Sequence, residues 1–249
     1  MASSRNALLN EQHALIRKLE TLFALSEEER NAVLALPILV ETVPADNDIA
    51  CEGDRPSRCC LLVEGVAATY KMTEGGTRQT MAFHVPGDVP DLQSLHLEVL
   101  DMSLGALTEC KIGYIRHQAL NDLCESHYRL SKAFWRETLI QAAVFREWVL
   151  NVGRRDAYSA LAHLLCEFVT RMRVVGLADG NRCEFPQTQS ELGDALGIST
   201  VHVNRTLMEL RGAGLITLKG GVLTVLDWER LKGAGEFDPT YLHLRQEAA

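Results

Sequence analysis

The chain has 249 residues, a formal net charge of −8, 47% hydrophobic residues and 23% charged residues. This length can bury a sizeable core in one large or two modest domains, and the composition is globular, which excludes a disordered or fibrous chain. No apolar run approaches the roughly eighteen residues that a membrane helix needs, and the opening stretch MASSRNALLNEQHALIRKLE predicts a polar helix instead of a signal peptide. We therefore expect a cytoplasmic protein with no membrane partner.

Short strand-like runs separated by turn signals occupy residues 36–120. They include CCLLVEGVAATYKM and RQTMAFHV, joined by the turn E-G-G at 74–76, and LGALTECKIGYI, which comes after the turn P-G-D at 86–88. Many short runs at this spacing predict an antiparallel β-barrel or jelly roll. Together with the polar helix, they form the expected first domain, residues 1–125.

Residues 126–152 predict one long helix, because neither glycine nor proline interrupts most of this stretch. At about 1.5 Å per residue the helix would reach roughly 40 Å. Its large side chains recur at steps near three and four, which is the pattern of a seam for another helix. The seam either packs against its own chain or joins two copies, and we expect the two-fold dimer, the commonest oligomer. The expected dimer-interface residues are Leu130, Phe134, Gln141, Phe145, Trp148 and Val152.

Residues 153–249 predict a winged helix-turn-helix. Thr188 and Glu191 form a T-x-x-E capping box at the start of a short helix, and the tight turn at 197–199 leads into a second helix that ends at Gly212. Two strand-like runs around the glycine pair at 220–221 then form the wing. The expected core residues of the motif are Leu192, Leu196, Ile198, Val203 and Leu207.

The second helix of this motif carries the chemistry for reading DNA. At 3.6 residues per turn, Val201, Asn204, Arg205 and Met208 share one outward face. Arg205 can donate two hydrogen bonds to a guanine, Asn204 suits an adenine, and Val201 offers only apolar contact, such as with a thymine methyl group. Small polar residues at the helix starts would hold phosphate oxygens. The expected DNA-binding residues are Thr188, Ser190, Ser199, Thr200, Val201, His202, Asn204 and Arg205.

The negative net charge does not exclude DNA, because charge is spread unevenly. Residues 151–221 hold eight Lys/Arg and seven Asp/Glu, so this segment is close to neutral and the acidity lies elsewhere. A near-neutral segment still binds phosphates when its few cations share one face.

The order of barrel, long helix and winged helix-turn-helix, with E-L-G-D-A-L-G-I-S and V-H-V-N-R-T-L in the last part, resembles the Crp/Fnr family of bacterial transcription regulators. The resemblance spans residues 35–230 and is most specific at 188–216. It implies a homodimer that binds double-stranded DNA at a pseudo-palindromic site, contacts RNA polymerase, and answers a small-molecule or redox effector. In that family a glutamate usually stands four residues before the arginine matched by Arg205. This chain has Val201 there, so the base preference of that glutamate is not carried over.

The barrel resembles the family's cyclic-nucleotide-binding domain, with Gly65 and the turn at 86–88 in matching places. Nucleotide-binding members continue with Gly-Glu-Leu and later an Arg-Ser or Arg-Thr pair that holds the cyclic phosphate. Here P-D-L at 90–92 and M-S at 102–103 stand in those places, and no arginine lies between Arg78 and Arg116. An anion in this stretch would meet repulsion and a desolvation cost. We therefore predict that cyclic AMP does not bind in the usual pocket. The acidic residues of the stretch are Asp88, Asp91, Glu98 and Asp101.

Other members of the family sense through an iron-sulfur cluster or haem. The cluster type needs cysteines near the amino terminus, whereas the first cysteine here is Cys51. His84 and His96 are candidate haem or metal ligands, but isolated barrel histidines are more typical of structural roles, so we expect no cofactor and no metal. The seven cysteines are odd in number and lack C-x-x-C spacing, which predicts reduced core thiols, with redox sensing through Cys183 or the Cys59/Cys60 pair as the alternative.

Two rival functions remain open at this point. A cupin-like metalloenzyme would need closely spaced His-x-His plus a carboxylate on adjacent strands, and neither this pattern nor a nucleophile triad, phosphate loop or H-E-x-x-H motif occurs, so we expect no enzyme. A sensor that has lost DNA binding and acts through protein contacts is the other rival, because only three Lys/Arg lie between Pro186 and Gly221. The leading prediction is an α+β transcription regulator with a β jelly roll, a dimerisation helix and a DNA-binding domain.

Overall fold

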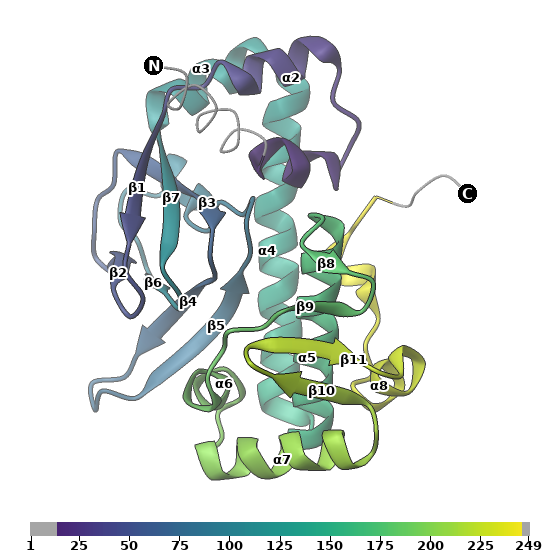
Figure 1. Cartoon of the computed structure of the whole chain (residues 1–249). Coiled ribbons are helices and arrows are strands. Elements are labelled where there is room, and N and C mark those ends of the chain that lie inside the picture. Colours follow the sequence, from purple (N-terminus) through teal and green to yellow (C-terminus); the bar gives the residue numbers. More distant parts are fainter. Residues whose placement is uncertain (1–13, 246–249) are drawn as a thin grey trace. The chain divides into compact units, whose positions relative to one another are not determined.

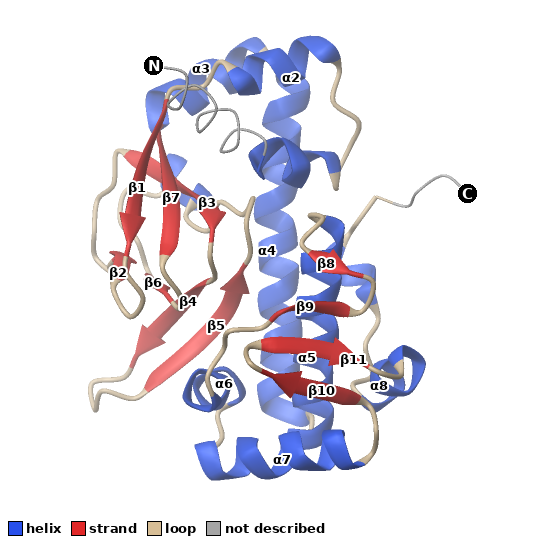
Figure 2. Ribbon diagram, in the orientation of Figure 1, coloured by secondary structure: helices blue, strands red, loops and turns tan. Residues whose placement is uncertain are grey.

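The computed structural model describes residues 14–245, and its fold is α+β, as predicted. Two helical segments come first, the barrel strands and then long helices follow, and short helices with a small sheet complete the chain (Figures 1 and 2). Residues 14–20 are helical, in agreement with the predicted polar helix, whose first part at 1–13 lies outside the described residues. The elements of the first half are α2 (Glu27–Leu34), β1 (Ile38–Val43), β2 (Asp48–Ala50), β3 (Arg58–Glu64), β4 (Ala67–Met72), β5 (Arg78–His84), η1 (Leu92–Leu95), β6 (Ser103–Ala106), β7 (Cys110–Arg116) and α3 (His117–Ser126). The elements of the second half are α4 (Tyr128–Arg154), α5 (Ala157–Val174), β8 (Ala178–Asp179), β9 (Arg182–Glu184), α6 (Gln189–Leu196), α7 (Thr200–Gly212), β10 (Ile216–Lys219), β11 (Val222–Val225), α8 (Trp228–Ala234) and η2 (Pro239–Leu242).

The described residues group into two compact units. The first unit holds the described residues up to Thr69, then His84–Ala142 and the described residues from His243 onward. The second unit holds Tyr70–Phe83 and Ala143–Leu242. The three segments predicted from the sequence, 1–125, 126–152 and 153–249, therefore differ from these units, and their independent folding stays a prediction.

The strands form two antiparallel barrel sheets, with the orders β1-β7-β3 and β2-β6-β4-β5. Strand β3 is buried on both faces, and successive side chains of a strand point to opposite faces. Cys59 and Leu61 accordingly join an apolar cluster with the 14–20 helix, α3 and α4, whereas Cys60 and Leu62 join a second cluster with β6 and β7. This arrangement confirms the predicted antiparallel jelly roll.

The P-G-D turn is held by buried charges inside the first unit. Gly87 adopts a φ of +101°, and a Cβ there would lie 2.8 Å from the carbonyl oxygen of Ala14, so the turn packs directly on the 14–20 helix. The ammonium group of Lys18 lies 2.9 Å from the carboxylate of Asp88 and 3.0 Å from that of Glu137 on α4. The turn predicted from sequence is thus also the point where the barrel, the first helix and α4 share one ion network.

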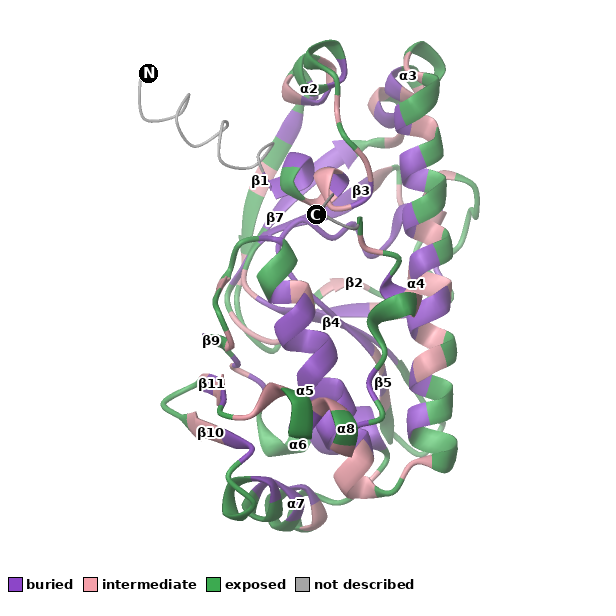
Figure 3. Cartoon of the chain, turned by 90° about the vertical axis from the view of Figure 1, so that its right-hand side faces the viewer, coloured by how far each residue is buried: buried purple, intermediate pink, exposed green. Residues whose placement is uncertain are grey.

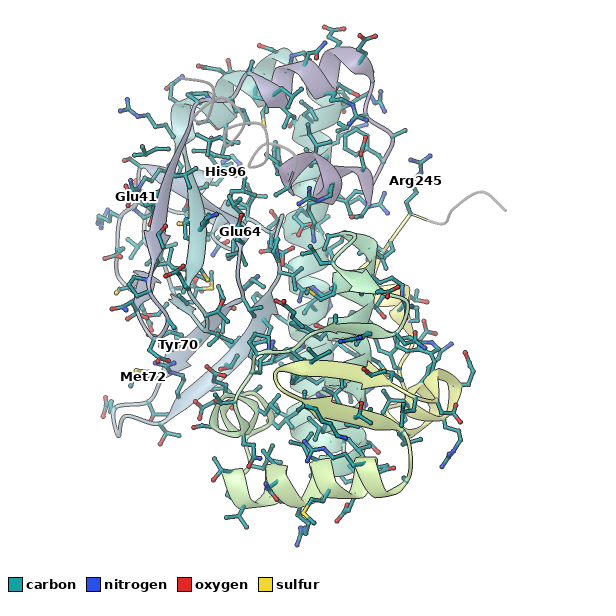
Figure 4. All side chains as sticks on the ribbon, in the orientation of Figure 1. Glu41, Glu64, Tyr70, Met72, His96 and Arg245 are labelled. Carbon is teal, nitrogen blue, oxygen red and sulfur yellow. The ribbon has the colours of Figure 1, made fainter. Side chains whose placement is uncertain are left out.

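Most of the cysteines are buried, whereas Cys51 is exposed. All seven cysteines are free thiols, and burial raises the pKa of Cys183 to about 11 and that of Cys166 to about 12. A buried thiol that keeps its proton reacts slowly, which weighs against redox sensing through these groups. His84 is buried and its Nε2 lies 3.2 Å from the hydroxyl of Thr69, while His96 is exposed in the loop after η1 (Figure 4). Between residues 14 and 245 there is no group of three or more His, Cys, Asp or Glu side chains placed to hold a metal ion.

Helix α4 was predicted at nearly the correct bounds, and three of the six residues of the predicted dimer seam, Leu130, Phe134 and Trp148, are buried within their own chain. Leu130 and Phe134 belong to the apolar core of the first unit, and Gln141 donates through Nε2 to the carbonyl of Val89 at 3.1 Å. Trp148 is buried in the second unit, where its Nε1 lies 3.2 Å from the carboxylate of Glu167. The apolar periodicity correctly predicted a buried helix face, and that face packs against its own chain. Periodicity alone does not indicate whether the covering surface belongs to the same chain or to a second copy.

A different apolar face of α4 is exposed. Buried and exposed residues alternate along this helix (Figure 3). Of the predicted seam, Phe145 is half-buried and Val152 is exposed. None of the helices in the described part of the chain is long and apolar enough to cross a membrane. The large exposed apolar residues of α4 are Tyr128, Trp135, Leu139, Val149, Leu150 and Val152.

Candidate nucleic-acid interface

Both helices of the helix-turn-helix begin at the predicted caps. The hydroxyl of Thr188 accepts from the backbone N–H of Glu191 at 3.3 Å, and the Glu191 carboxylate accepts in return from the backbone N–H of Thr188 at 2.6 Å. The hydroxyl of Ser199 accepts from the backbone N–H of His202 at 3.3 Å and caps α7. A capping hydroxyl still has its own proton, which it can donate to a phosphate oxygen. Each of the hydroxyls of Thr188 and Ser199 can therefore cap its helix and donate to a phosphate oxygen at the same time.

The turn between α6 and α7 requires glycine at two positions. A Cβ on Gly193 would lie 2.7 Å from the carbonyl oxygen of Ile198, and Gly197 adopts a left-handed φ of +66°. The backbone N–H of Ile198 also donates to the carbonyl of Gly193 at 3.2 Å. The expected core residues Leu192, Leu196, Val203 and Leu207 are buried, and Ile198 is half-buried.

A hairpin segment of the second unit also supports α6. Gln79 on β5 donates through Nε2 to the carbonyl of Ala195 at the end of α6, at 3.3 Å. Burial raises the pKa of the neighbouring Asp194, and the positive charge of Arg78 opposes that rise. No local sequence pattern predicts this support, because the two partners are 116 residues apart.

Four of the eight expected DNA-binding residues line one shallow hollow on α7. The other four are Thr188, Ser190, Ser199 and His202, which lie at the starts of the two helices and do not line the hollow. Ser190 is exposed and His202 is half-buried. Gln189, Met208 and Glu209 complete the hollow and were not in the expected set, although Met208 was placed on the same helix face. The lining residues are Gln189, Thr200, Val201, Asn204, Arg205, Met208 and Glu209.

The side chains of Asn204 and Arg205 in this hollow each have one weak or exchangeable contact within the chain. Asn204 donates through Nδ2 to the side-chain oxygen of Gln189 at 3.1 Å, which leaves its second amide proton and its oxygen for a base. The Nε of Arg205 lies 3.8 Å from the carboxylate of Glu209, and both side chains are more than half exposed. An exposed pair of this kind contributes at most about 0.5 kcal/mol, so Arg205 can exchange it for a base or a phosphate.

The wing completes the motif. β10 and β11 pair antiparallel around the glycines at 220–221, and the sheet continues in the order β10-β11-β9-β8. Both turn glycines have positive φ, as a tight hairpin requires. The predicted winged helix-turn-helix is therefore present, with an exposed helix face and a β-hairpin in the same unit.

Two family models match the chain in the order that this architecture suggests. The model for a cyclic nucleotide-binding domain matches residues 40–127, and the model for a Crp-like helix-turn-helix domain matches residues 159–234. The chain belongs to the Crp/Fnr family of transcription regulators. It is a transcription regulator of this family, with a helix-turn-helix DNA-binding domain in its C-terminal part, and nothing in the comparisons supports a cupin enzyme.

Individual relatives are distant but span most of the chain. The transcriptional activator protein FnrL of Cereibacter sphaeroides is 25% identical over 191 residues, which are 75% of this chain and 76% of that protein. The nitrogen fixation regulation protein FixK of Rhizobium meliloti is 23% identical over 190 residues, 76% of this chain and 82% of the relative. Among solved structures, FixK2 from Bradyrhizobium japonicum has a TM-score of 0.71 at 23% identity, covering 80% of this chain and 98% of that one.

Replacing Gly193 by alanine is expected to lower the free energy of unfolding by about 1 to 3 kcal/mol, because the new Cβ would force α6 away from the carbonyl of Ile198. The matched control is Gly212→Ala at the end of α7, where a Cβ meets no atom within 4 Å and alanine is the better helix former. That control should gain about 0.5 to 1 kcal/mol. Urea unfolding followed by circular dichroism measures both variants, and equal stabilities would contradict the close approach.

Proposed function

We propose that this regulator acts as a homodimer on a pseudo-palindromic DNA site, with α7 of each copy in the major groove. The observation that carries the proposal is the exposed face of α7, where Asn204 and Arg205 line one hollow beside the start of α6. An Arg fork matches the O6 and N7 atoms of guanine, and an Asn amide matches the N6 and N7 atoms of adenine. Two-fold symmetry places the half-sites about one helical turn, roughly 34 Å, apart.

Phosphate contacts would supply most of the affinity. The amino-terminal ends of α6 and α7 present unpaired backbone N–H groups, and the exposed hydroxyl residues Thr188, Ser190, Ser199 and Thr200 lie at these ends. Arg211 on α7 and Lys219 at the wing are exposed and add positive charge. Binding should therefore weaken steeply as salt concentration rises. This set of donors also weighs against the rival function of a sensor that has lost DNA binding.

The dimer would form through the exposed face of α4 in place of the seam predicted from sequence. Trp135, Leu139, Ala142, Arg146 and Val149 follow one another at steps of four, three, four and three, which is the heptad spacing of a coiled coil. The three large apolar residues of this row are exposed. Burying them against a second copy removes apolar surface from water, which stabilises the dimer by about 25 cal/mol for each Å² of apolar surface buried.

The barrel would sense something other than cyclic AMP. Asp88 and Asp91 are buried in the stretch that would meet the nucleotide phosphate, and the ammonium group of Lys18 lies 2.9 Å from the carboxylate of Asp88 and 3.0 Å from that of Glu137. Asp91 accepts a hydrogen bond from the backbone N–H of Cys60 at 2.8 Å. An anionic phosphate placed there would face the buried carboxylates of Asp88 and Asp91, which repel it. We further propose that the barrel responds to a small-molecule or redox effector and that the regulator contacts RNA polymerase. The protein would act in the cytoplasm and would have no catalytic activity.

Changing Arg205 to alanine is expected to weaken binding to the cognate site by about 1 to 3 kcal/mol and to relax the preference at one base pair. The site is found by selecting bound fragments from random DNA, and fluorescence anisotropy then measures affinity. Arg211→Ala, an exposed arginine in the last turn of the same helix, is the control and should weaken all sequences alike. Absence of any sequence preference in the selection would contradict the proposed function, and a uniform loss in the Arg205 variant would reduce that residue to a phosphate contact.

Leu139→Lys is expected to convert the dimer to a monomer, because it places a charge in the middle of the exposed α4 face. Leu139 is 56% exposed, and the matched control is Leu39→Lys on β1, where a leucine is 59% exposed. Sedimentation equilibrium should find the control dimeric and the α4 variant monomeric at the same concentration. Persistence of the dimer in the α4 variant would show that copies associate elsewhere.

Calorimetric titration with cyclic AMP is expected to give no binding in the micromolar range, because of the buried carboxylates at positions 88 and 91. The same preparation must bind its selected DNA site, which shows that the protein is folded and active. A micromolar dissociation constant for cyclic AMP would overturn this part of the proposal.

A further inference from the structure

The first turn of α7 presents an apolar side chain where a polar reader would be expected. Val201 is 78% exposed and lines the same hollow as Asn204 and Arg205. Its side chain has neither donor nor acceptor. A β-branched apolar residue at this exposure gains nothing for the stability of the isolated unit, so its use has to be sought in what α7 contacts.

The position of Val201 decides which part of the DNA it meets. Recognition helices contact base edges with the residues of their amino-terminal turns, and Val201 is the second residue of α7. Asn204 and Arg205 follow three and four positions later, on the same face. The base next to Val201 is therefore a neighbour of the bases that these two side chains read.

The chemistry of the major groove leaves one favourable partner for a valine there. Base edges in that groove present hydrogen-bond donors and acceptors, and the C5 methyl group of thymine is their apolar feature. A valine pressed against a donor or acceptor removes its water and returns no hydrogen bond. Against a methyl group, both partners bury apolar surface.

Met208 is the other apolar residue of the hollow, and it serves as the internal comparison. It is exposed and lies seven positions after Val201, which is about 10 Å further along the helix axis. That distance places it near the carboxyl-terminal half of α7, away from the turns that reach base edges. The two apolar side chains thus share a face but not a place in the groove.

We propose that Val201 reads a thymine methyl group: each half-site contains one thymine whose C5 methyl packs on Val201, beside the bases bound by Asn204 and Arg205. This inference rests on the proposed function, since it names a base that the same helix recognises.

Deoxyuridine substitution isolates that methyl group, because deoxyuridine lacks the methyl and keeps every hydrogen-bonding group of thymine. Starting from the selected site, a set of duplexes carries one thymine-to-deoxyuridine change each, and anisotropy titration measures binding of the full-length protein. For the unaltered chain, one position in each half-site should lose affinity about threefold to tenfold, the effect expected of one buried methyl group. Thymines in the spacer should show no change.

Val201→Ala should bind more weakly than the unaltered chain and should lose most of the deoxyuridine penalty, because the shorter side chain withdraws both γ-methyl groups from the thymine methyl. Alanine is favourable in a helix and the position is exposed, so this variant is expected to fold. Met208→Ala is the matched control and should keep the full deoxyuridine penalty. The inference is overturned if no thymine of a sequence-selective site responds, or if the response persists in Val201→Ala. Absence of selective binding to any DNA would instead remove the proposed function, and this inference with it.

Discussion

The geometry of the helix-turn-helix depends on one backbone contact, the approach of Gly193 to the carbonyl oxygen of Ile198. Any other residue would place a Cβ 2.7 Å from that oxygen, so the contact fixes how closely α6 lies against the turn. Gly197 then reverses the chain with a left-handed φ of +66°, and Ser199 starts α7 at once. Because the turn is this short, Val203 and Leu207 are buried while the opposite face of α7 stays exposed. Recognition of a base edge is possible because that division of faces is enforced.

The charge distribution explains how an acidic chain can belong to a DNA-binding family. Several carboxylates of the first unit serve its own packing: Asp88 of the barrel and Glu137 of α4 share Lys18, and Asp91 accepts from the backbone of Cys60. These groups lie in the first unit, whereas the exposed cations Arg205 and Arg211 lie in the second. The net charge of the chain is therefore a poor guide to its affinity for phosphates, since the carboxylates named here are partners in internal ion pairs and hydrogen bonds.

Helix α4 has two apolar stripes with different uses. One stripe, with Leu130, Phe134 and Trp148, is buried within the two units. The other, with Trp135 and Leu139, is exposed and has the spacing of a coiled-coil seam. One stripe of the helix therefore packs within the chain, and the other leaves large apolar side chains exposed.

The sequence by itself determined the element order, the glycine turns and the helix caps, because each depends on neighbours within a few residues. The Thr188 and Glu191 capping box, the turn at 197–199 and the wing glycines were all predicted from such local patterns. The four hollow residues Thr200, Val201, Asn204 and Arg205 were predicted as one exposed group at the start of the second helix. Tertiary structure decided which stripe of α4 is buried, which side chain holds Asp88, and that Gln79 and Gln189 support the recognition motif. These features join residues that are far apart in the chain or on separate helices, so local sequence patterns do not predict them. A helical apolar period of 3.6 residues is the same whether the surface that covers the helix is near or distant in sequence.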